Sequence, residues 1–391
     1  MWRWIIPTML TIGLVGCNLP NEQKIQARDR WQKTRASAMA SVGAEQLKSG
    51  ELDKAQTQVR QALRLSQECL TARIVLAKVL IEKGQYAEAA KELEEADRQV
   101  PRNPEVAYLW GVALEKRGEL DQALQQYEKA QSLDDSNNAY VTAAAEVLAA
   151  KGQVVQALEV LETRMARSDS DDSMLALAAE LAMLANRPQR AAELYQRCLD
   201  ASPKSMAQRE GLAKAQFFAR DYAAALEALD RLTAHADYRD KVSWPYIMSG
   251  DCHMAMGRPL DARGAYELAC QIDPGEVGAW LCLARCGLAS GDVARAETAC
   301  RRAQALAPTS ADAAVLLGLS LLRQNKSDKA AEAARAGLKH HADEPALLCL
   351  LGRALWASGQ AYQAADCYRQ ALQREPENAL AKALLAKLEC E

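Results

Sequence analysis

Residues 243–276 read SWPYIMSGDCHMAMGRPLDARGAYELACQIDPGE, and this stretch shows how most of the chain is built. Gly250 lies in its first half, Gly257 marks its centre, and Ala262 begins the second half. Apolar residues around these marks recur at helical spacing. Glycine readily adopts the left-handed backbone that ends a helix. The stretch therefore predicts two helices joined by a tight turn.

The same unit recurs along the chain. Steps of 34 residues, with three extra residues allowed once, return alanine ten times, at Ala55, Ala89, Ala123, Ala157, Ala191, Ala225, Ala262, Ala296, Ala330 and Ala364. Twelve residues before each of these, the chain has Gly or Ala. Small residues in both halves allow two helices to pack closely. We predict six units in residues 36–239, an insertion at 240–242 that forms a hinge or merely lengthens a loop, and four units in 243–378.

The centre of each unit has its own residue pattern. The ten positions are Gly50, Gly84, Gly118, Gly152, Asn186, Arg220, Gly257, Gly291, Asn325 and Gly359. Nine are Gly or Asn, the residues that tolerate a left-handed helix end. Every proline after Pro20 falls at an expected helix boundary, where its missing N–H is tolerated. The fold class predicted is all-α.

The unit resembles the tetratricopeptide repeat, which has a large residue and Gly in its first helix, then Ala, an aromatic residue, Ala and Pro. The matching residues are Trp110, Gly111, Leu114, Ala123, Tyr127 and Ala130; Tyr246, Gly250, Ala262, Tyr266, Ala269 and Pro274; and Leu351, Gly352, Leu355, Ala364, Tyr368, Ala371 and Pro376. Units four to six depart from it at Arg164, Cys198 and Leu232. The resemblance implies a right-handed superhelical α-solenoid of helix-turn-helix repeats. Residues 379–391 are apolar on one side and predict a capping helix.

The N-terminus has the pattern of a secretory signal. Arg3 precedes the short apolar run 5–15, which is too short to span a bilayer as a helix. Residues 14–17, Leu-Val-Gly-Cys, resemble the lipobox of bacterial lipoproteins. The resemblance implies a signal peptide at 1–16 and palmitate or other acyl chains on Cys17. The polar residues that follow predict a tether at 17–35 that can become helical at its end. An ordinary signal peptide with a chance cysteine is the alternative. Asn18 favours the outer membrane, facing the periplasm.

Composition and motifs exclude several functions. Lys and Arg number 48 and Asp and Glu 51, a net charge of -3 that gives no basic surface for nucleic acid. The chain has no phosphate loop, HExxH motif or nucleophile elbow, so we expect no catalytic residue, cofactor or metal.

The acidic run 168–173 lacks the glycine of a calcium loop, since Met174 stands there, and we expect it to cap a helix. Ten cysteines besides Cys17 suit packing, with disulfides and then a metal site as alternatives.

In the tetratricopeptide repeat family, which this chain resembles, the first helices of the units line a concave groove that binds proteins or peptides. The predicted partner-binding residues here are Tyr108, Phe217, Phe218, Trp244, Ile247, Asp251, Met254, Arg285, Arg353 and Trp356. Aromatic residues and Met concentrate in such binding surfaces. The alternative is that some of them only pack against the next first helix.

The predicted function is a membrane-anchored scaffold that assembles a pilus, secretion or polysaccharide-export system of the bacterial envelope. An adaptor that presents envelope proteases or cell-wall enzymes to their substrates is the alternative. An enzyme accessory that uses bound metal is a third possibility.

Overall fold

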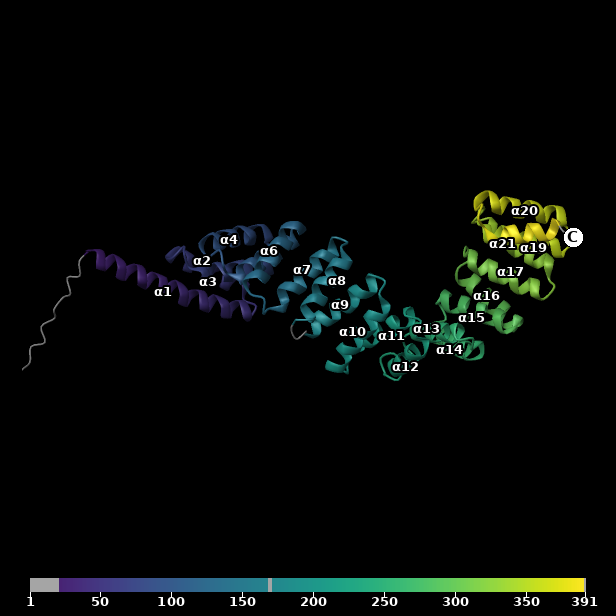
Figure 1. Ribbon diagram of the computed structural model, residues 1–391, viewed down its shortest axis with the longest axis horizontal. Helices are drawn as coiled ribbons and strands as arrows, with labels where there is room; N and C mark the ends of the chain where they lie inside the picture. Colours follow the sequence, from purple (N-terminus) through teal and green to yellow (C-terminus); the bar gives the residue numbers. More distant parts are fainter. Residues whose placement is uncertain (1–20, 168–170, 390–391) are drawn as a thin grey trace, which may run out of the picture. The chain divides into compact units, whose positions relative to one another are not determined.

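The computed structural model describes residues 21–167 and 171–389, which form helices, turns and loops without a strand (Figure 1). The signal peptide, Cys17 and residues 168–170 of the acidic run lie outside these residues. The helices are α1 Asn21–Lys48, α2 Leu52–Leu65, α3 Leu70–Glu82, α4 Tyr86–Gln99, α5 Pro104–Lys116, α6 Leu120–Leu133, α7 Asn138–Ala150, α8 Val154–Met165, α9 Asp172–Leu184, α10 Pro188–Ala201, α11 Met206–Phe218, α12 Tyr222–Thr233, α13 Trp244–Ala255, α14 Pro259–Ile272, α15 Val277–Ser290, α16 Val293–Leu306, α17 Ala311–Arg323, α18 Ser327–Leu338, α19 Pro345–Ala357, α20 Ala361–Arg374 and α21 Ala379–Glu389.

The turn inside each unit has the backbone that the sequence predicts. All ten central positions have positive φ, from 56° at Asn186 to 82° at Gly291. Arg220 is neither Gly nor Asn, yet its backbone is left-handed too, with a φ of 63°. An arginine there bears the steric strain that glycine avoids.

The recurring alanine is a core residue of each unit. All ten are fully buried, with no exposed surface. A larger side chain at this position would push the helices of a unit apart. The close helix packing predicted from the two small positions is therefore present along the whole repeat.

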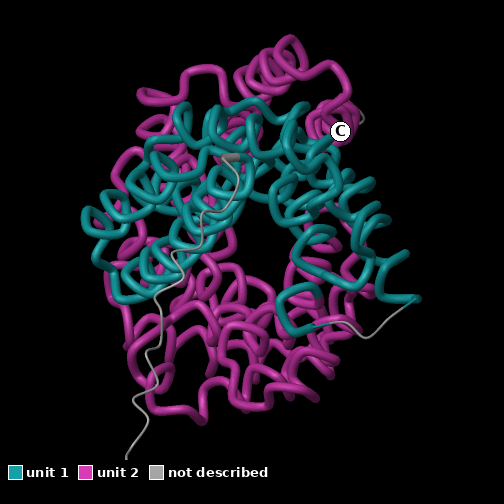
Figure 2. Tube along the Cα trace, turned by 90° about the vertical axis from the view of Figure 1, so that its left-hand side faces the viewer, with its two compact units in different colours: residues 1–174 teal, residues 175–391 magenta. Residues whose placement is uncertain are grey.

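The chain divides into two compact units, residues 1–174 and residues 175–391, drawn in teal and magenta in Figure 2. Unit 1 has a core that includes Val59, Leu80 and Leu93. Unit 2 has a core that includes Tyr266 and Tyr368. The boundary between the units falls within α9 and not at the predicted insertion.

The predicted insertion falls in the loop between α12 and α13. This loop covers residues 234–243, and Asp240 there has a φ of 58°. The Tyr238 hydroxyl donates a hydrogen bond to the Glu210 carboxylate in α11, and Arg239 donates to the Ala234 carbonyl at 3.3 Å. The extra residues thus form a longer loop that is bonded to the preceding first helix.

The segment expected as a tether is helical from residue 21 onward. It continues without a break into the first helix of the first unit, so α1 has 28 residues. Neither Gly nor Pro occurs between residues 21 and 42 to interrupt it. Ala36 is the first described residue of α1 with no exposed surface, so the packing of α1 against its neighbours begins there.

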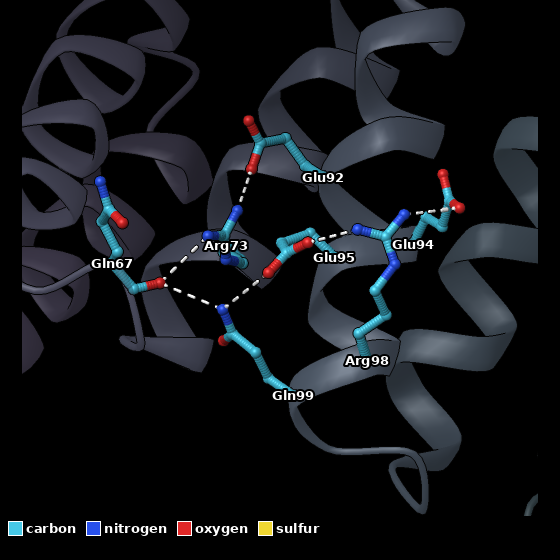
Figure 3. A network of polar contacts seen from close by, with 7 residues as sticks. All are labelled: Gln67, Arg73, Glu92, Glu94, Glu95, Arg98 and Gln99. Carbon is cyan, nitrogen blue, oxygen red and sulfur yellow. Dashed lines mark hydrogen bonds and ion pairs between the residues drawn. The ribbon is translucent and has the colours of Figure 1, made fainter.

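Polar contacts fix the edge of the second unit of the repeat (Figure 3). The Arg73 guanidinium of α3 contacts the Glu92 carboxylate of α4 at 2.7 Å. Arg73 and Gln99 both donate to the backbone carbonyl of Gln67, at 3.1 Å and 3.3 Å. Gln67 lies in the loop between α2 and α3, so these bonds join that loop to the hairpin that follows it.

Two caps were predicted, one for the helix that follows the acidic run and one for the end of the repeat. Asp171 accepts a hydrogen bond from the Met174 backbone N–H at 2.8 Å, so the acidic run does supply a cap for α9. At the other end, α21 packs Leu384, Leu385 and Leu388 against the core of unit 2 and leaves Leu380 exposed. This helix therefore packs on the last unit of the repeat.

Candidate functional site

The predicted partner-binding residues all lie on first helices, and the structure separates those of unit 2 into four groups. The first group is aromatic and belongs to α11 and α13 in unit 2. Phe218 is 61% exposed, and its ring meets the Phe217 ring edge-on at 5.5 Å between centroids. Phe217 and Trp244 are half-buried and pack against one cluster that includes Leu229 and Cys252. Phe218 is therefore the exposed aromatic residue of a group that the core supports.

Electrostatics add a cation to this aromatic group. The Lys214 ammonium lies 4.6 Å from the centroid of the Trp244 ring, within the range of a cation–π contact. The contact holds the indole against α11. Phe217 and Trp244 thus serve packing as well as any binding, which is the alternative that the sequence left open.

The second group lies along α13. Ile247 and Met254 are half-buried and pack against the main core of unit 2. Asp251 accepts a hydrogen bond of 2.7 Å from the Tyr266 hydroxyl. Most of the interactions of these three side chains are internal to unit 2.

Arg285 forms the third group, on α15. Its guanidinium is exposed and lies 3.1 Å from the Cys282 sulfur. It lines a cavity of ≈ 150 Å³ with Leu281, Asp312, Val315 and Leu316. The cavity has apolar walls with the Arg285 guanidinium and the Asp312 carboxylate beside them, and its volume suits a small side chain of a ligand.

The fourth group, Arg353 and Trp356, lies on α19. Together with Leu322 and Ala357 these residues line a cavity of ≈ 310 Å³. The Lys387 ammonium of α21 lies 5.2 Å from the Trp356 ring centroid. The capping helix therefore contributes a positive charge beside this cavity.

Tyr108 lies in unit 1, in surroundings of different charge. Its ring lies 5.7 Å from the Tyr127 ring and 5.3 Å from the Tyr140 ring. Tyr127 donates to the Glu115 carboxylate at 2.8 Å. Partial loss of solvent, followed by the charge of Glu115, raises the pKa of Glu146 above its ordinary value. This face is acidic. Glu115 is not among the site residues predicted from the sequence, although the buried Tyr127 ring signals an acceptor for its hydroxyl.

A further cavity lies on the second helices of unit 1, where the sequence departs from the repeat. It has a volume of ≈ 570 Å³ and is lined by residues of α6 and α8, among them Leu124, Val160 and Arg164. Arg164 is 7% exposed; its guanidinium lies 3.1 Å from Asp135 and donates to Asn138 at 2.9 Å. A long side chain in the place of a small one is accommodated by these polar partners.

The cysteines pack as small apolar residues. Of the nine in the described part of the chain, eight are buried, Cys69 is half-buried, and none is bonded to another. Burial raises the pKa of Cys252, Cys270 and Cys300 to about 12. Their burial agrees with the packing interpretation. Within residues 21–167 and 171–389, no three His, Cys, Asp or Glu side chains are grouped to hold a metal ion.

No helix in the described residues combines the length and the apolar character needed to cross a bilayer.

Successive helical hairpins, each closed by a left-handed turn, define the class of all-α helical repeat solenoids. Two family models described as tetratricopeptide repeat match the chain, one at residues 46–110 and 253–319 and the other at 315–379 and 349–389. The chain belongs to the tetratricopeptide repeat family, whose repeats form scaffolds for protein–protein interactions. Residues 111–252 are not matched, and they contain the departures at Arg164, Cys198 and Leu232.

Several solved structures are similar to parts of this chain. The MamA protein is 22% identical, with 44% of this chain and 93% of that chain covered and a TM-score of 0.40. A tetratricopeptide repeat protein from Parabacteroides merdae ATCC 43184 is 19% identical over 66% of this chain and all of that one, at a TM-score of 0.43. YrrB, described as having an unusual peptide-binding site, is 17% identical, with 49% and 96% covered and a TM-score of 0.43. No curated protein sequence matches the chain.

Proposed function

We propose that this chain is a lipid-anchored scaffold of the bacterial envelope, attached to the outer membrane and facing the periplasm, which binds partner proteins through its first helices. The process served is assembly of a pilus, secretion or polysaccharide-export system. The observation that carries the binding part is Phe218, a large apolar side chain that is 61% exposed on a first helix. The Leu-Val-Gly-Cys sequence at 14–17 supports the anchor.

Phe218 can supply binding energy because its neighbours hold it in place. Phe217 contacts it edge-on and also contacts Tyr222, with ring centroids 5.9 Å apart. A partner that covers Phe218 removes apolar surface from water without first having to order a mobile side chain. Aromatic residues supported in this way are the usual centres of protein interfaces.

Site-specific cross-linking tests the binding surface. A photoreactive phenylalanine analogue replaces Phe218 in cells, and Tyr362 serves as the matched control because it is 81% exposed but belongs to second helix α20. We expect a discrete cross-linked protein from position 218 and none from position 362. Equal cross-linking from both positions, or none from 218, would remove the support for this surface.

Acylation and fractionation test the anchor separately. Cys17→Ser should abolish incorporation of labelled palmitate and release the chain from membranes. Cys69→Ser, which alters a half-buried thiol inside the repeat, should leave both unchanged. Membrane association that survives Cys17→Ser would contradict the lipid anchor without affecting the binding surface.

A further inference from the structure

The first half of α1 is almost uncovered by the rest of the described chain. Its side chains are exposed from Glu22 to Arg35, except for the half-buried Gln32. Burial without exposed surface begins only at Ala36. Figure 1 shows the start of α1 extending beyond α2. This half of the helix therefore offers its sides to a ligand instead of to the repeat.

One side of α1 combines basic and apolar residues, and we call it the basic stripe. Lys24, Arg28, Trp31 and Arg35 follow one another at intervals of four, three and four residues, which places their side chains in one row along a helix. Val42, seven residues after Arg35, continues the row. Trp31 is 56% exposed and Val42 is 49% exposed. The basic stripe thus joins three cations to two exposed apolar side chains.

The buried side of α1 points in another direction. Ala36, Ala40 and Gly43 are buried, and a Cβ at Gly43 would meet the Val59 side chain of α2. At about 100° per residue, these positions lie about a third of a turn around the helix from the basic stripe. The two acids of this segment, at positions 22 and 29, lie on the buried side by the same count. Packing on the repeat therefore leaves the basic stripe in solvent and keeps both acids away from it.

Positive charge is concentrated in this segment. Residues 21–35 contain five basic and two acidic side chains, a net charge of +3, whereas the whole chain has a net charge of -3. Among the five, Lys33 alone forms an ion pair with another residue of the described chain, Glu68 at 2.9 Å. The Arg35 guanidinium lies 5.1 Å from the Trp31 ring centroid, a cation–π contact within the basic stripe. The cations of the basic stripe are therefore available to an external anion.

The proposed anchor lies next to the basic stripe in the sequence. Asn21, the first residue of α1, follows Cys17 by four residues. An extended chain spans at most about 3.6 Å per residue, so the two Cα atoms are at most about 15 Å apart. Acyl chains on Cys17 would hold the start of α1 within this distance of a bilayer. A positive helix side that is kept so close to a bilayer meets anionic headgroups before any diffusing partner.

We propose that the basic stripe lies on the bilayer surface and binds the phosphate groups of anionic phospholipids. Lys24, Arg28 and Arg35 donate to phosphate oxygens, and Trp31 places its indole among the headgroups, where tryptophan is enriched at membrane interfaces. The helix then lies along the membrane, so α1 orients the first unit of the repeat. Binding that depends mainly on charge weakens as the salt concentration rises. The inference rests on the proposed function, since the lipid anchor brings α1 to the bilayer.

Sedimentation with vesicles tests this surface without an acyl chain. The chain from residue 17 onward, with Cys17→Ser, keeps every residue that the structure describes and lacks the apolar run 5–15. We expect it to bind vesicles of phosphatidylcholine mixed with phosphatidylglycerol at least about tenfold more tightly than vesicles of phosphatidylcholine alone. Tryptophan emission should shift to the blue with the anionic vesicles, and Trp31→Phe should abolish that shift.

Charge removal locates the binding on α1. Arg28→Gln combined with Arg35→Gln should weaken binding to the anionic vesicles by about tenfold to thirtyfold, because two cations leave the contact. Lys91→Gln combined with Arg102→Gln is the matched control, since both residues are exposed in unit 1 and the same net charge is lost. It should change the affinity by less than about twofold. Glutamine is a good helix former, so circular dichroism should show equal helical content in both double variants.

Several results would overturn the proposal. Equal binding to neutral and anionic vesicles, or equal effects of the two double variants, would show that the basic stripe is not the contact. Release from the vesicles by inorganic phosphate at constant ionic strength would make a free anion the ligand. Dimers that form without vesicles and are lost in Trp31→Phe would make a second copy of the chain the occupant.

The inference and the proposed anchor can fail separately. Labelling of the native chain with palmitate reports on Cys17 and does not depend on Arg28 or Arg35. An acylated chain whose Cys17→Ser form ignores anionic vesicles would refute the basic stripe alone. Binding of that form to the vesicles without any acylation of the native chain would refute the anchor alone.

Discussion

The Tyr266 ring fills the space that a side chain at Gly250 would need. A Cβ at Gly250 would lie 2.4 Å from Cε1 of Tyr266 and 2.7 Å from its Cδ1. The ring cannot move aside freely, because it is buried and its hydroxyl bonds to Asp251 at 2.7 Å. The small residue and the aromatic residue of the repeat are therefore two halves of one contact.

Gly250→Ala should lower the free energy of unfolding by about 1–3 kcal/mol, the usual cost of overpacking a core. Gly264→Ala is the control, since no atom lies within 4 Å of a Cβ there and the position is helical. Alanine at that site should stabilise by about 0.5–1 kcal/mol. Chemical denaturation measures both, and equal effects of the two substitutions would disprove the contact.

Arg220→Gly should stabilise the protein by about 1 kcal/mol, because it relieves the strain of a left-handed non-glycine residue. The φ of Arg220 is 63°. Gly118→Ala, at the equivalent turn with φ of 80°, should destabilise by about 1 kcal/mol. Thermal unfolding of the two variants checks the prediction, and a loss of stability in Arg220→Gly would show that the arginine makes a compensating contact.

Glu146→Gln should raise the free energy of unfolding at neutral pH. The gain should be no more than about 0.5 kcal/mol, because solvent screens the charge of the exposed side chain. The folded-state pKa of Glu146 lies above its ordinary 4.5, through partial loss of solvent and the charge of Glu115. The ionised form therefore disfavours folding, and the advantage of Gln should disappear as the pH falls to 4.5. Glu159→Gln, on the second helix of the same unit, should show no such pH-dependent gain.

Alkylation of the native protein at neutral pH should modify Cys69 well before Cys252, Cys270 and Cys300. These three thiols are buried and have pKa values of about 12, so almost no thiolate is present. Peptide mass spectrometry after timed labelling gives the rate at each site. In denaturant all four should react at similar rates, and fast native labelling of Cys300 would contradict its burial.

The turns and the helix contacts could be read from single residues. Positive φ at Gly84 or Gly257 follows from residue type, and the burial of Ala262 follows from its spacing along two helices. The same regularity predicted the turn at Arg220, where residue type alone argues against it. The backbone preference of a residue and the spacing of side chains along a helix depend only on nearby residues, so both can be predicted directly from the sequence.

The candidate site was only partly predictable. Phe217, Phe218 and Trp244 were expected to be equivalent binding residues, yet the first and last are half-buried in a core cluster and only Phe218 is largely exposed. Tyr368 was identified as a packing residue, and the absence of an acceptor for its hydroxyl became visible only in three dimensions. Residues equivalent in the repeat differ in function because their neighbours in space differ.

By itself the sequence determined the all-α repeat, its ten turns and its small-residue contacts, because each depends on residues within one 34-residue unit. Tertiary structure decided the boundary within α9 and the pairing of Tyr127 and Tyr266 with carboxylates. It also left the buried Tyr368 hydroxyl without an acceptor. Burial and hydrogen-bond satisfaction depend on every group around an atom, which spacing along the chain does not specify.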